Sequence, residues 1–268
     1  MKQSELYDKI LNAGELATAE EELEADVNPL YSIREAYNDW RSSLPEMQEK
    51  VDALVWINQI MDEKYNEALD LANKADYSPQ DLYTFLGLDW QKEWEDDIEN
   101  YDRGPGVIKH GIFPSAFVNA LEVDEVRVPD MSDVFDFGYR NSSDIIVEGD
   151  VGDSFGKSME GGRVVIEGDS DLNLAHSMQN GEIIVKGDSE GVWNPQGKVK
   201  VHGDLERAYQ IEGILRVNGD LEEIRGDDRV NISGQIFVEG EVGEIMNETL
   251  EGTEIYQKQN GEWEQVFP

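Results

Sequence analysis

The chain contains no cysteine among its 268 residues. This absence excludes cysteine-ligated zinc, iron–sulfur clusters, a thiol nucleophile and any disulfide framework within the chain. No apolar run approaches the roughly 18–20 residues that a membrane-spanning helix needs, and no apolar signal core follows Met1 and Lys2. We therefore expect a soluble, cytoplasmic protein with no membrane partner, whose core folds without covalent support.

Basic residues are scarce, with 22 lysines and arginines against 59 acidic residues and a net charge of −37. The imbalance is spread along the chain, because residues 1–103 hold 26 acidic and 9 basic residues and residues 104–268 hold 33 and 13. A uniformly acidic surface is typical of proteins that work in molar salt, where the Debye length falls to about 3 Å. The composition predicts a halophilic, archaeal protein. An acidic surface aimed at a basic partner would instead gather its charge in one patch.

Residues 1–103 show the periodicity of helices. Pro29 follows a break and opens one helix, a longer one runs from Ser43 to about Asn73, and Ser78 and Pro79 cap a third that ends at Gly87. A last helix carries the stripe Trp90, Trp94, Ile98 and Tyr101. We predict an all-α domain over residues 1–103.

The last two of these helices have the order of a helix-turn-helix motif. The second helix would read DNA, yet its residues 93–99 hold five carboxylates, with a single lysine just before them. Such a helix repels phosphate, and the chain has no basic stripe elsewhere. We therefore predict no nucleic-acid partner.

The sequence Arg103-Gly-Pro-Gly106 is the clearest boundary signal in the chain. Residues 104–124 beyond it are apolar and mixed. Since a solenoid exposes an apolar end that must be covered, we assign residues 104–124 to a junction that caps the first rung.

Residues 125–268 repeat. A 19-residue unit occurs at Gly149 and again at Gly168, and a shorter core of Gly-x-φ-x-(Val/Ile)-x-Gly-(Asp/Glu), with φ aliphatic, recurs from Ser143 to Glu241. One strong strand in each unit of 16–21 residues predicts a β-solenoid, because no single unit buries its own face. The alternating aliphatics should point inward, and the glycines should mark corners that need positive φ or close backbone approach. We predict an α+β protein with a single-stranded right-handed β-helix of about six to seven rungs.

The corner carboxylates should stack at about 4.8 Å in successive rungs. They are Asp150, Asp169, Asp188, Asp204 and Asp220, followed by Glu241. Such a column is a weak candidate for binding cations, but each corner offers one carboxylate and lacks the nonapeptide of calcium β-rolls. The favoured interpretation is that each aspartate accepts a backbone N–H at a tight turn.

The middle residue of each strand should face outward. These residues are Arg127, Ile146, Val165, Ile184, Lys200, Arg216 and Phe237. Three consecutive aliphatics on an outer surface are not explained by the core of a solenoid. We predict that Ile146, Val165 and Ile184 form an interaction site, covered by the helical domain or by a second subunit or partner.

The unit at Gly149 resembles the Gly-x-Gly-x-Gly β-helix family, whose members include the C-terminal domain of the glutamate synthase large subunit and the C subunit of formylmethanofuran dehydrogenase. The matching positions are Gly149, Asp150, Gly152, Gly156, Met159, Gly161, Gly162, Met178, Gly181 and Gly187. The resemblance covers about residues 143–188, and the second copy departs from it at Asp171, Ala175 and Asn180. It implies a right-handed β-helix that serves assembly while other domains or subunits catalyse, so no catalytic residue carries over.

We therefore expect a non-catalytic scaffold protein with no catalytic residue, metal or cofactor. Two alternatives stay open. One is an enzyme or ligand-binding protein whose site lies between the helical domain and the β-helix, lined by residues such as Trp90, Trp94 and Trp193. The other is a polymer-forming β-helix, since the later repeats also look like those of bactofilins.

Overall fold

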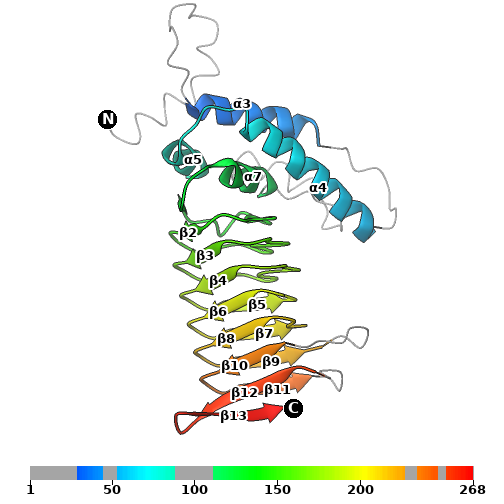
Figure 1. The fold of residues 1–268 in the computed structure, drawn as a ribbon, viewed down its shortest axis with the longest axis vertical. Helices are drawn as coiled ribbons and strands as arrows, with labels where there is room; N and C mark the ends of the chain where they lie inside the picture. The colour runs from blue at the N-terminus through cyan, green and yellow to red at the C-terminus, as the bar shows by residue number, and fades with distance from the viewer. Residues whose placement is uncertain (1–28, 45–52, 88–110, 227–233, 247–251, 268) are drawn as a thin grey trace, which may run out of the picture.

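The computed structural model describes residues 29–44, 53–87, 111–226, 234–246 and 252–267. Within them, helices gather at one end of the molecule and a column of stacked strands forms the rest (Figure 1). The helix expected around Trp90, Trp94, Ile98 and Tyr101 lies outside the described residues. Side chains are described only from Gln59 onward in the second helix.

Among the described residues, three helices precede the junction, namely α3 (Pro29–Ser42), α4 (Ala53–Ala72) and α5 (Pro79–Leu86). The predicted start at Pro29 is confirmed, and the apolar face of α3 is buried. The predicted cap of α5 is confirmed as well, because the Ser78 hydroxyl accepts the Asp81 N–H at 3.3 Å while the Asp81 carboxylate accepts the Ser78 N–H at 2.9 Å. None of the described helices is both long and apolar enough to cross a membrane.

The repeats form the predicted β-solenoid, and its main sheet has nine strands. In spatial order they are β1 (Val126–Val128), β2 (Ile145–Val147), β3 (Arg163–Ile166), β4 (Glu182–Val185), β6 (Lys198–Val201), β8 (Ile214–Val217), β10 (Gln235–Val238), β12 (Glu254–Gln259) and β13 (Glu262–Phe267). Neighbours pair in parallel from β1 to β12 without register shift, so equivalent residues of successive turns stack.

A second sheet forms in the shorter repeats, which the sequence pattern did not indicate. It consists of four parallel strands, β5 (Ser189–Trp193), β7 (Leu205–Tyr209), β9 (Leu221–Arg225) and β11 (Val242–Met246). The two 19-residue units have no strand there. The segments 150–162 and 169–181, which we call the arms, instead contact the next turn through isolated bridges such as Val151 to Ser170 and backbone hydrogen bonds such as Ser154 N–H to Leu172 O at 2.9 Å.

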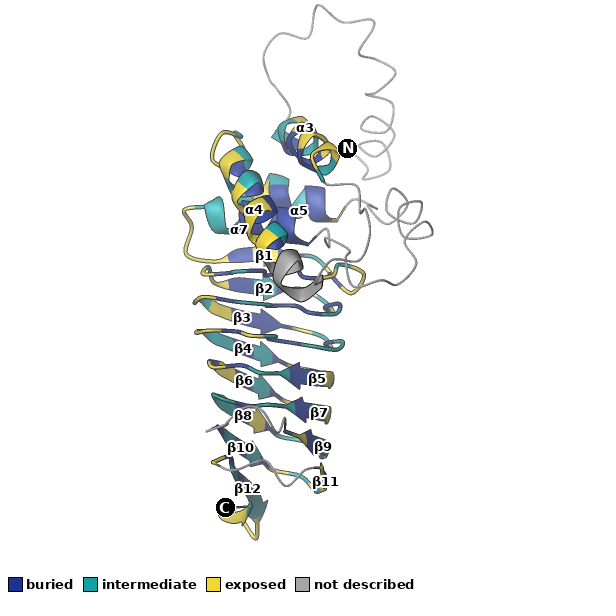
Figure 2. Cartoon of the chain, turned by 90° about the vertical axis from the view of Figure 1, so that its right-hand side faces the viewer, coloured by how far each residue is buried: buried dark blue, intermediate teal, exposed yellow. Residues whose placement is uncertain are grey.

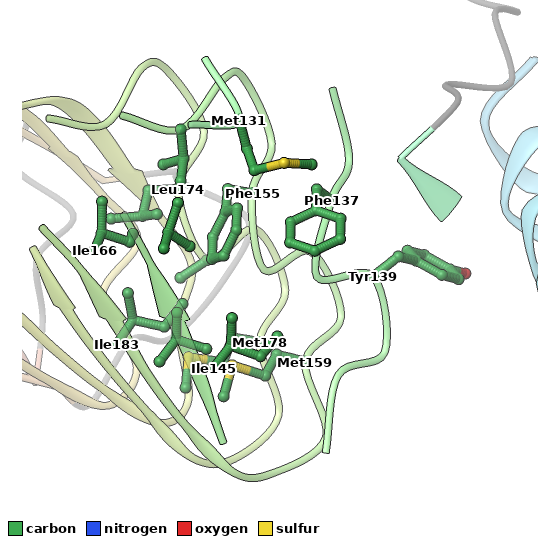
Figure 3. Packing of buried hydrophobic residues seen from close by; sticks show 14 of the residues in the cluster. Met131, Phe137, Tyr139, Ile145, Phe155, Met159, Ile166, Leu174, Met178 and Ile183 are labelled. Atoms are coloured by element: carbon green, nitrogen blue, oxygen red, sulfur yellow. The ribbon is translucent and has the colours of Figure 1, made fainter. Parts of the chain in front are cut away.

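The predicted inward aliphatics fill the solenoid. Pairs from Ile145 and Val147 through Ile236 and Val238 are at most 1% exposed. In the long units, Phe155, Met159 and Met178 from the arms close the core against the strands (Figure 3). In the long units the arms supply the apolar side chains that close the core, and in the shorter repeats the second sheet supplies them.

The long arms place three equivalent residues in the left-handed region. These are Gly138, Gly156 and Ala175, with φ of 78°, 70° and 60°. Glycine adopts this conformation at no steric cost, whereas alanine is strained there. The arm geometry thus survives in the second copy of the unit, where Ala175 replaces the glycine of the family pattern.

Helix α7 (Ile112–Ala120) lies on the first turn of the solenoid. The Ser115 hydroxyl accepts the N–H groups of Gly138 and Tyr139 at 2.8 and 3.1 Å, and the Gly111 N–H donates to Phe135 O at 3.1 Å. Helices α4 and α5 pack on α7, above the strands (Figure 2). One continuous apolar core therefore joins the described helices to the solenoid. The boundaries 1–103, 104–124 and 125–268 stay predictions.

The chain closes the main sheet with a hairpin. Strand β13 pairs antiparallel to β12, and the turn between them is Asn260-Gly261 with φ of 52° and 88°. Positive φ at both central residues is what a two-residue hairpin turn requires. The Asn-Gly dipeptide therefore carried a signal for this hairpin that the repeat analysis missed.

Candidate functional site

The three predicted interaction residues lie side by side on the main sheet. Ile146 pairs with Val165, and Val165 pairs with Ile184, in successive strands. Val165 keeps 8% of its surface exposed, and the two isoleucines are partly exposed. We call these three residues the stripe. The described helices lie beyond the end of the sheet and do not run along the stripe (Figures 1 and 2).

Ion pairs between neighbouring turns frame the stripe on both sides. Arg163 Nε lies 3.2 Å from Glu182 Oε2, and Lys186 Nζ lies 2.6 Å from Glu167 Oε2. Each pair bridges β3 and β4 at opposite ends of the strands. Exposed pairs of this kind add little stability, up to about 1 kcal/mol each. Their main effect is to fix the charge pattern around the apolar residues.

Beyond the stripe the same column becomes basic and then aromatic. Lys200 and Arg216 follow Ile184, and the Arg216 guanidinium lies 4.4 Å from the centre of the Phe237 ring. Phe237 stacks on Tyr256 with ring centres 5.0 Å apart and planes at 10°. Stacked rings and a cation over an aromatic face stabilise the sheet end without any ligand.

The outer face of the main sheet is electrically balanced. We define it as the outward residues of strands β1 to β12, together with the outward residues that flank them. Its seven basic residues are Arg127, Arg163, Lys186, Lys198, Lys200, Arg216 and Lys258, and its seven acidic residues are Glu125, Asp144, Glu148, Glu167, Glu182, Glu239 and Glu254. The balance contrasts with the charge of −37 on the whole chain.

The corner carboxylates form a hydrogen-bonded ladder along the solenoid. Each accepts the backbone N–H of the acidic residue one turn later, in the order Asp130 from Asp150 (2.9 Å), Asp150 from Asp169 (2.7 Å), Asp169 from Asp188 (2.8 Å), Asp188 from Asp204 (2.8 Å), Asp204 from Asp220 (2.8 Å) and Asp220 from Glu241 (2.7 Å). The aspartates therefore accept backbone N–H groups from the next turn of the solenoid, and Asp130 also accepts the Ser132 N–H of its own turn at 3.1 Å.

The ladder explains the glycine that precedes each of its later acids. A side-chain carbon at Gly168 or Gly187 would overlap the carboxylate of the previous turn, Asp150 or Asp169. Neither glycine has a positive φ. Of the two predicted reasons for corner glycines, close approach holds here, whereas Gly162 and Gly181 have positive φ.

A shallow groove of about 480 Å³ runs beside the ladder. Eight of its twelve lining residues are acidic and none is basic: Asp150, Asp169, Asp171, Asp188, Glu190, Asp204, Glu206 and Glu222. We call it the acidic groove. Desolvation raises the pKa of the Glu190 carboxyl, and the neighbouring carboxylates Asp171 and Glu206 raise that pKa further, against the lowering effect of Arg207.

The acidic groove does not assemble a metal site from the residues that the structure describes. Each ladder aspartate uses one carboxylate oxygen to accept a backbone N–H from the next turn. The predicted cation candidates Asp150, Asp169, Asp188 and Asp204 line the groove, but Asp220 does not. The geometry assigns the ladder a structural role, and cation binding stays an untested alternative.

The contact between helices and solenoid is filled with side chains. Tyr139 Oη donates to Asp62 Oδ1 at 2.8 Å, and Asn119 donates to Tyr65 Oη at 2.8 Å. Burial raises the pKa of the Tyr139 hydroxyl, and its bond to Asp62 raises that pKa further. Across this contact the rings of Tyr65 and Tyr139 pack edge to face, with ring centres 5.6 Å apart. These aromatic and hydrogen-bonded groups hold the two parts together.

Of the three tryptophans named for a pocket between the helical domain and the solenoid, the structure describes only Trp193. Trp193 stacks on Tyr209 with ring centres 4.4 Å apart and touches His176 at 5.8 Å, on the second sheet. Trp90 and Trp94 lie outside the described residues. Trp193 and Tyr209 stack because they are 16 residues apart, which is the length of one short repeat, and therefore pair in the neighbouring strands β5 and β7.

No protein-family model matches the chain, and its sequence matches no curated protein.

Proposed function

We propose that this protein is a non-catalytic assembly scaffold of a halophile, whose β-solenoid associates with protein through the stripe on its outer face. The observation that carries the proposal is a balanced surface with aliphatic residues at its centre, on a chain of charge −37. Protein interfaces are depleted in unpaired charge at their centre, and large apolar residues outside a core mark contact surfaces. Association at this surface avoids the repulsion that the rest of the chain imposes.

The fold that we propose in detail is a right-handed β-helix of the Gly-x-Gly-x-Gly type. Crossovers between parallel strands of one sheet are right-handed in about 98% of cases, which supports this hand. The resemblance of residues 143–188 supports the family, in which the β-helix serves assembly while other parts catalyse. The cytoplasm is the compartment that we propose, since the acidic surface suits a salt-filled cell interior.

The two alternatives are less well supported by the described contacts. A site between helices and solenoid would need an open cleft, yet hydrogen bonds of Ser115, Asn119 and Tyr139 join the two parts there. A polymer built end to end needs two open ends, and α7 lies on the first turn. Both alternatives would require the helical end to move away from the solenoid.

The test of the scaffold proposal is the substitution Val165→Glu. A carboxylate at the centre of the stripe adds an unpaired charge to the association surface while leaving the inward core untouched. We expect the variant to retain its fold. We expect its particle size, measured by light scattering on the fraction of a native cell extract that contains the protein, to be smaller than that of the wild type. The matched control is Asn218→Glu, which adds the same charge on the same sheet away from the stripe. An unchanged particle size and unchanged protease resistance in Val165→Glu would remove the basis of the proposal.

A further inference from the structure

The charges around the stripe follow an order that is complementary to itself. Four strands carry the pattern, β2, β3, β4 and β6, which stack in register. On one side of the stripe the residues are Asp144, Arg163, Glu182 and Lys198, and on the other side they are Glu148, Glu167, Lys186 and His202. When the order of the strands is reversed, every negative residue of the first column takes the place of a positive one, and every positive residue takes the place of a negative one. In the second column Glu167 and Lys186 exchange in the same way, whereas His202, opposite Glu148, is neutral near pH 7 because desolvation and the charges of Lys200 and Lys186 lower its pKa.

A two-fold axis uses this order directly. If the axis lies in the plane of the face, parallel to the strands and midway between β3 and β4, each column meets itself with the order of strands reversed. Arg163 then faces Glu182 of the second copy, and Glu167 faces Lys186 of the second copy. Val165 meets Ile184 of the second copy at the centre.

We propose that a second copy of this chain covers the stripe, packed face to face in this antiparallel, two-fold arrangement. The inference rests on the proposed scaffold function and names the partner of the same surface. The four facing ion pairs would join two intrachain pairs of each copy into networks, which hold better than isolated surface pairs. Val165 and Ile184 of both copies would lose their contact with water at the same time, while Ile146 would face Lys200 of the second copy.

Other face-to-face arrangements bring like charges together. A two-fold axis along the column would oppose Asp144 with Glu148 of the second copy and set the Lys200 residues of both copies against each other. An antiparallel axis through β3 would oppose the two Arg163 residues and the two Glu167 residues. The axis between β3 and β4 leaves one like-charged meeting, Arg127 with Arg216, and Arg127 is already held by Glu125 and Glu148.

Lys198 adds an independent indication. It forms no ion pair within the described residues, although the chain has far more acidic than basic groups. Asp144 is exposed, and its carboxylate accepts the backbone N–H of Arg163 at 2.7 Å. The proposed axis brings these two residues of different copies together.

The face is small for an interface. Four strands spaced by about 4.8 Å and five residues wide cover about 300 Å² of each copy, below the roughly 800 Å² per partner of a standard stable complex. We therefore expect weak, reversible association, with a dissociation constant of roughly 1–30 μM.

Complementation between two variants tests the arrangement. Lys198→Glu alone sets a new carboxylate against Asp144 of the second copy, and Asp144→Lys alone sets a new ammonium group against Lys198. Sedimentation equilibrium should therefore show each variant dissociating at least about tenfold more readily than the wild type. In an equimolar mixture every facing pair regains opposite charges. We expect the mixture to associate as the wild type does.

A second pair keeps the test valid if Asp144→Lys fails to fold, since Asp144 holds a backbone N–H. Arg163→Glu and Glu182→Arg should each associate poorly, and should restore association when mixed or when combined in one chain. A wild type that stays monomeric at about 100 μM, well above the range expected for this interface, would overturn the proposal, as would mixtures no better than their components. The scaffold function would survive that outcome if Val165→Glu still changed the particle size in the extract.

Discussion

The outer face and the acidic groove are built from the same repeat, yet they differ in what their charges do. On the outer face, charges of both signs pair across turns and frame an apolar stripe. In the acidic groove, carboxylates of one sign stack, and the ladder members are bound to backbone N–H groups of the next turn. The comparison shows that stacking places the same kind of charge at one position in every turn. The role of such a column follows from what neutralises its charges, which is an opposite side chain on the outer face and a backbone N–H in the ladder.

The two regions also differ in what the fold requires of them. The ladder is part of the solenoid's hydrogen bonding, because each carboxylate satisfies a donor that the turn leaves open. Nothing in the core or the turns requires Ile146, Val165 and Ile184 to be aliphatic. The ladder is therefore explained by folding, whereas the aliphatic residues of the stripe are not.

The largest expected effect breaks the ladder at its glycine. Gly168→Ala places a carbon where the Asp150 carboxylate lies, so the carboxylate must move and the Asp169 N–H loses its acceptor. We expect a loss of roughly 2–5 kcal/mol in the free energy of unfolding. The matched control is Gly161→Ala, where an added carbon meets no atom within 4 Å. Denaturant unfolding in high salt measures both, and equal stabilities would refute the role of the ladder.

A smaller effect separates hydrogen bonding from charge within the ladder. Asp188→Ala removes the acceptor of the Asp204 N–H, and we expect a loss of about 1 kcal/mol. Asp188→Asn keeps an acceptor oxygen and removes one negative charge, so its stability should equal or exceed that of the wild type. Thermal unfolding with and without Ca²⁺ at matched ionic strength adds the cation test. A selective Ca²⁺ stabilisation that Asp188→Asn abolishes would make the ladder a binding site after all.

The smallest effect concerns Glu190 in the acidic groove. Because its pKa is raised in the folded state, its contribution to stability is present below the unfolded pKa and is lost as pH rises through the folded pKa. Glu190→Gln should therefore melt close to the wild type at about pH 4 and above it at about pH 7. Melting curves in constant salt measure this difference. A difference that does not change with pH would mean that the carboxylates of the acidic groove do not repel.

Much of the fold followed from residues whose spacing has one physical meaning. The alternation of Ile145 and Val147 with outward residues predicted the strands, and Ser78 with Pro79 predicted a helix start, because both patterns act locally. The second sheet was missed because its buried residues, such as Leu221 and Ile224 in β9, lie three positions apart and do not follow the two-residue alternation of the main sheet. The hairpin at Asn260 was missed because its signal is a local Asn-Gly turn that lies beyond the last copy of the repeat.

The candidate site could likewise be predicted only where a local pattern determines it. The stripe could be predicted, since outward positions follow from the register of an alternating strand. The ladder's acceptors could not, because a donor in the next turn is a property of stacking between distant residues such as Asp169 and Asp188. The self-complementary order of charges could not be predicted either, because it depends on the strand register that places Asp144 and Lys198 in one column.

Carboxylate labelling as a function of protein concentration compares the two regions in one sample. Glycine ethyl ester coupled by a carbodiimide modifies exposed carboxylates, and mass spectrometry reads each site. We expect Glu167 and Glu182 on the outer face to become protected as the concentration rises, while Glu206 and Glu222 in the acidic groove are modified equally throughout. Protection of the acidic groove with an unchanged outer face, or no change at either, would contradict the assignment of contact to the stripe.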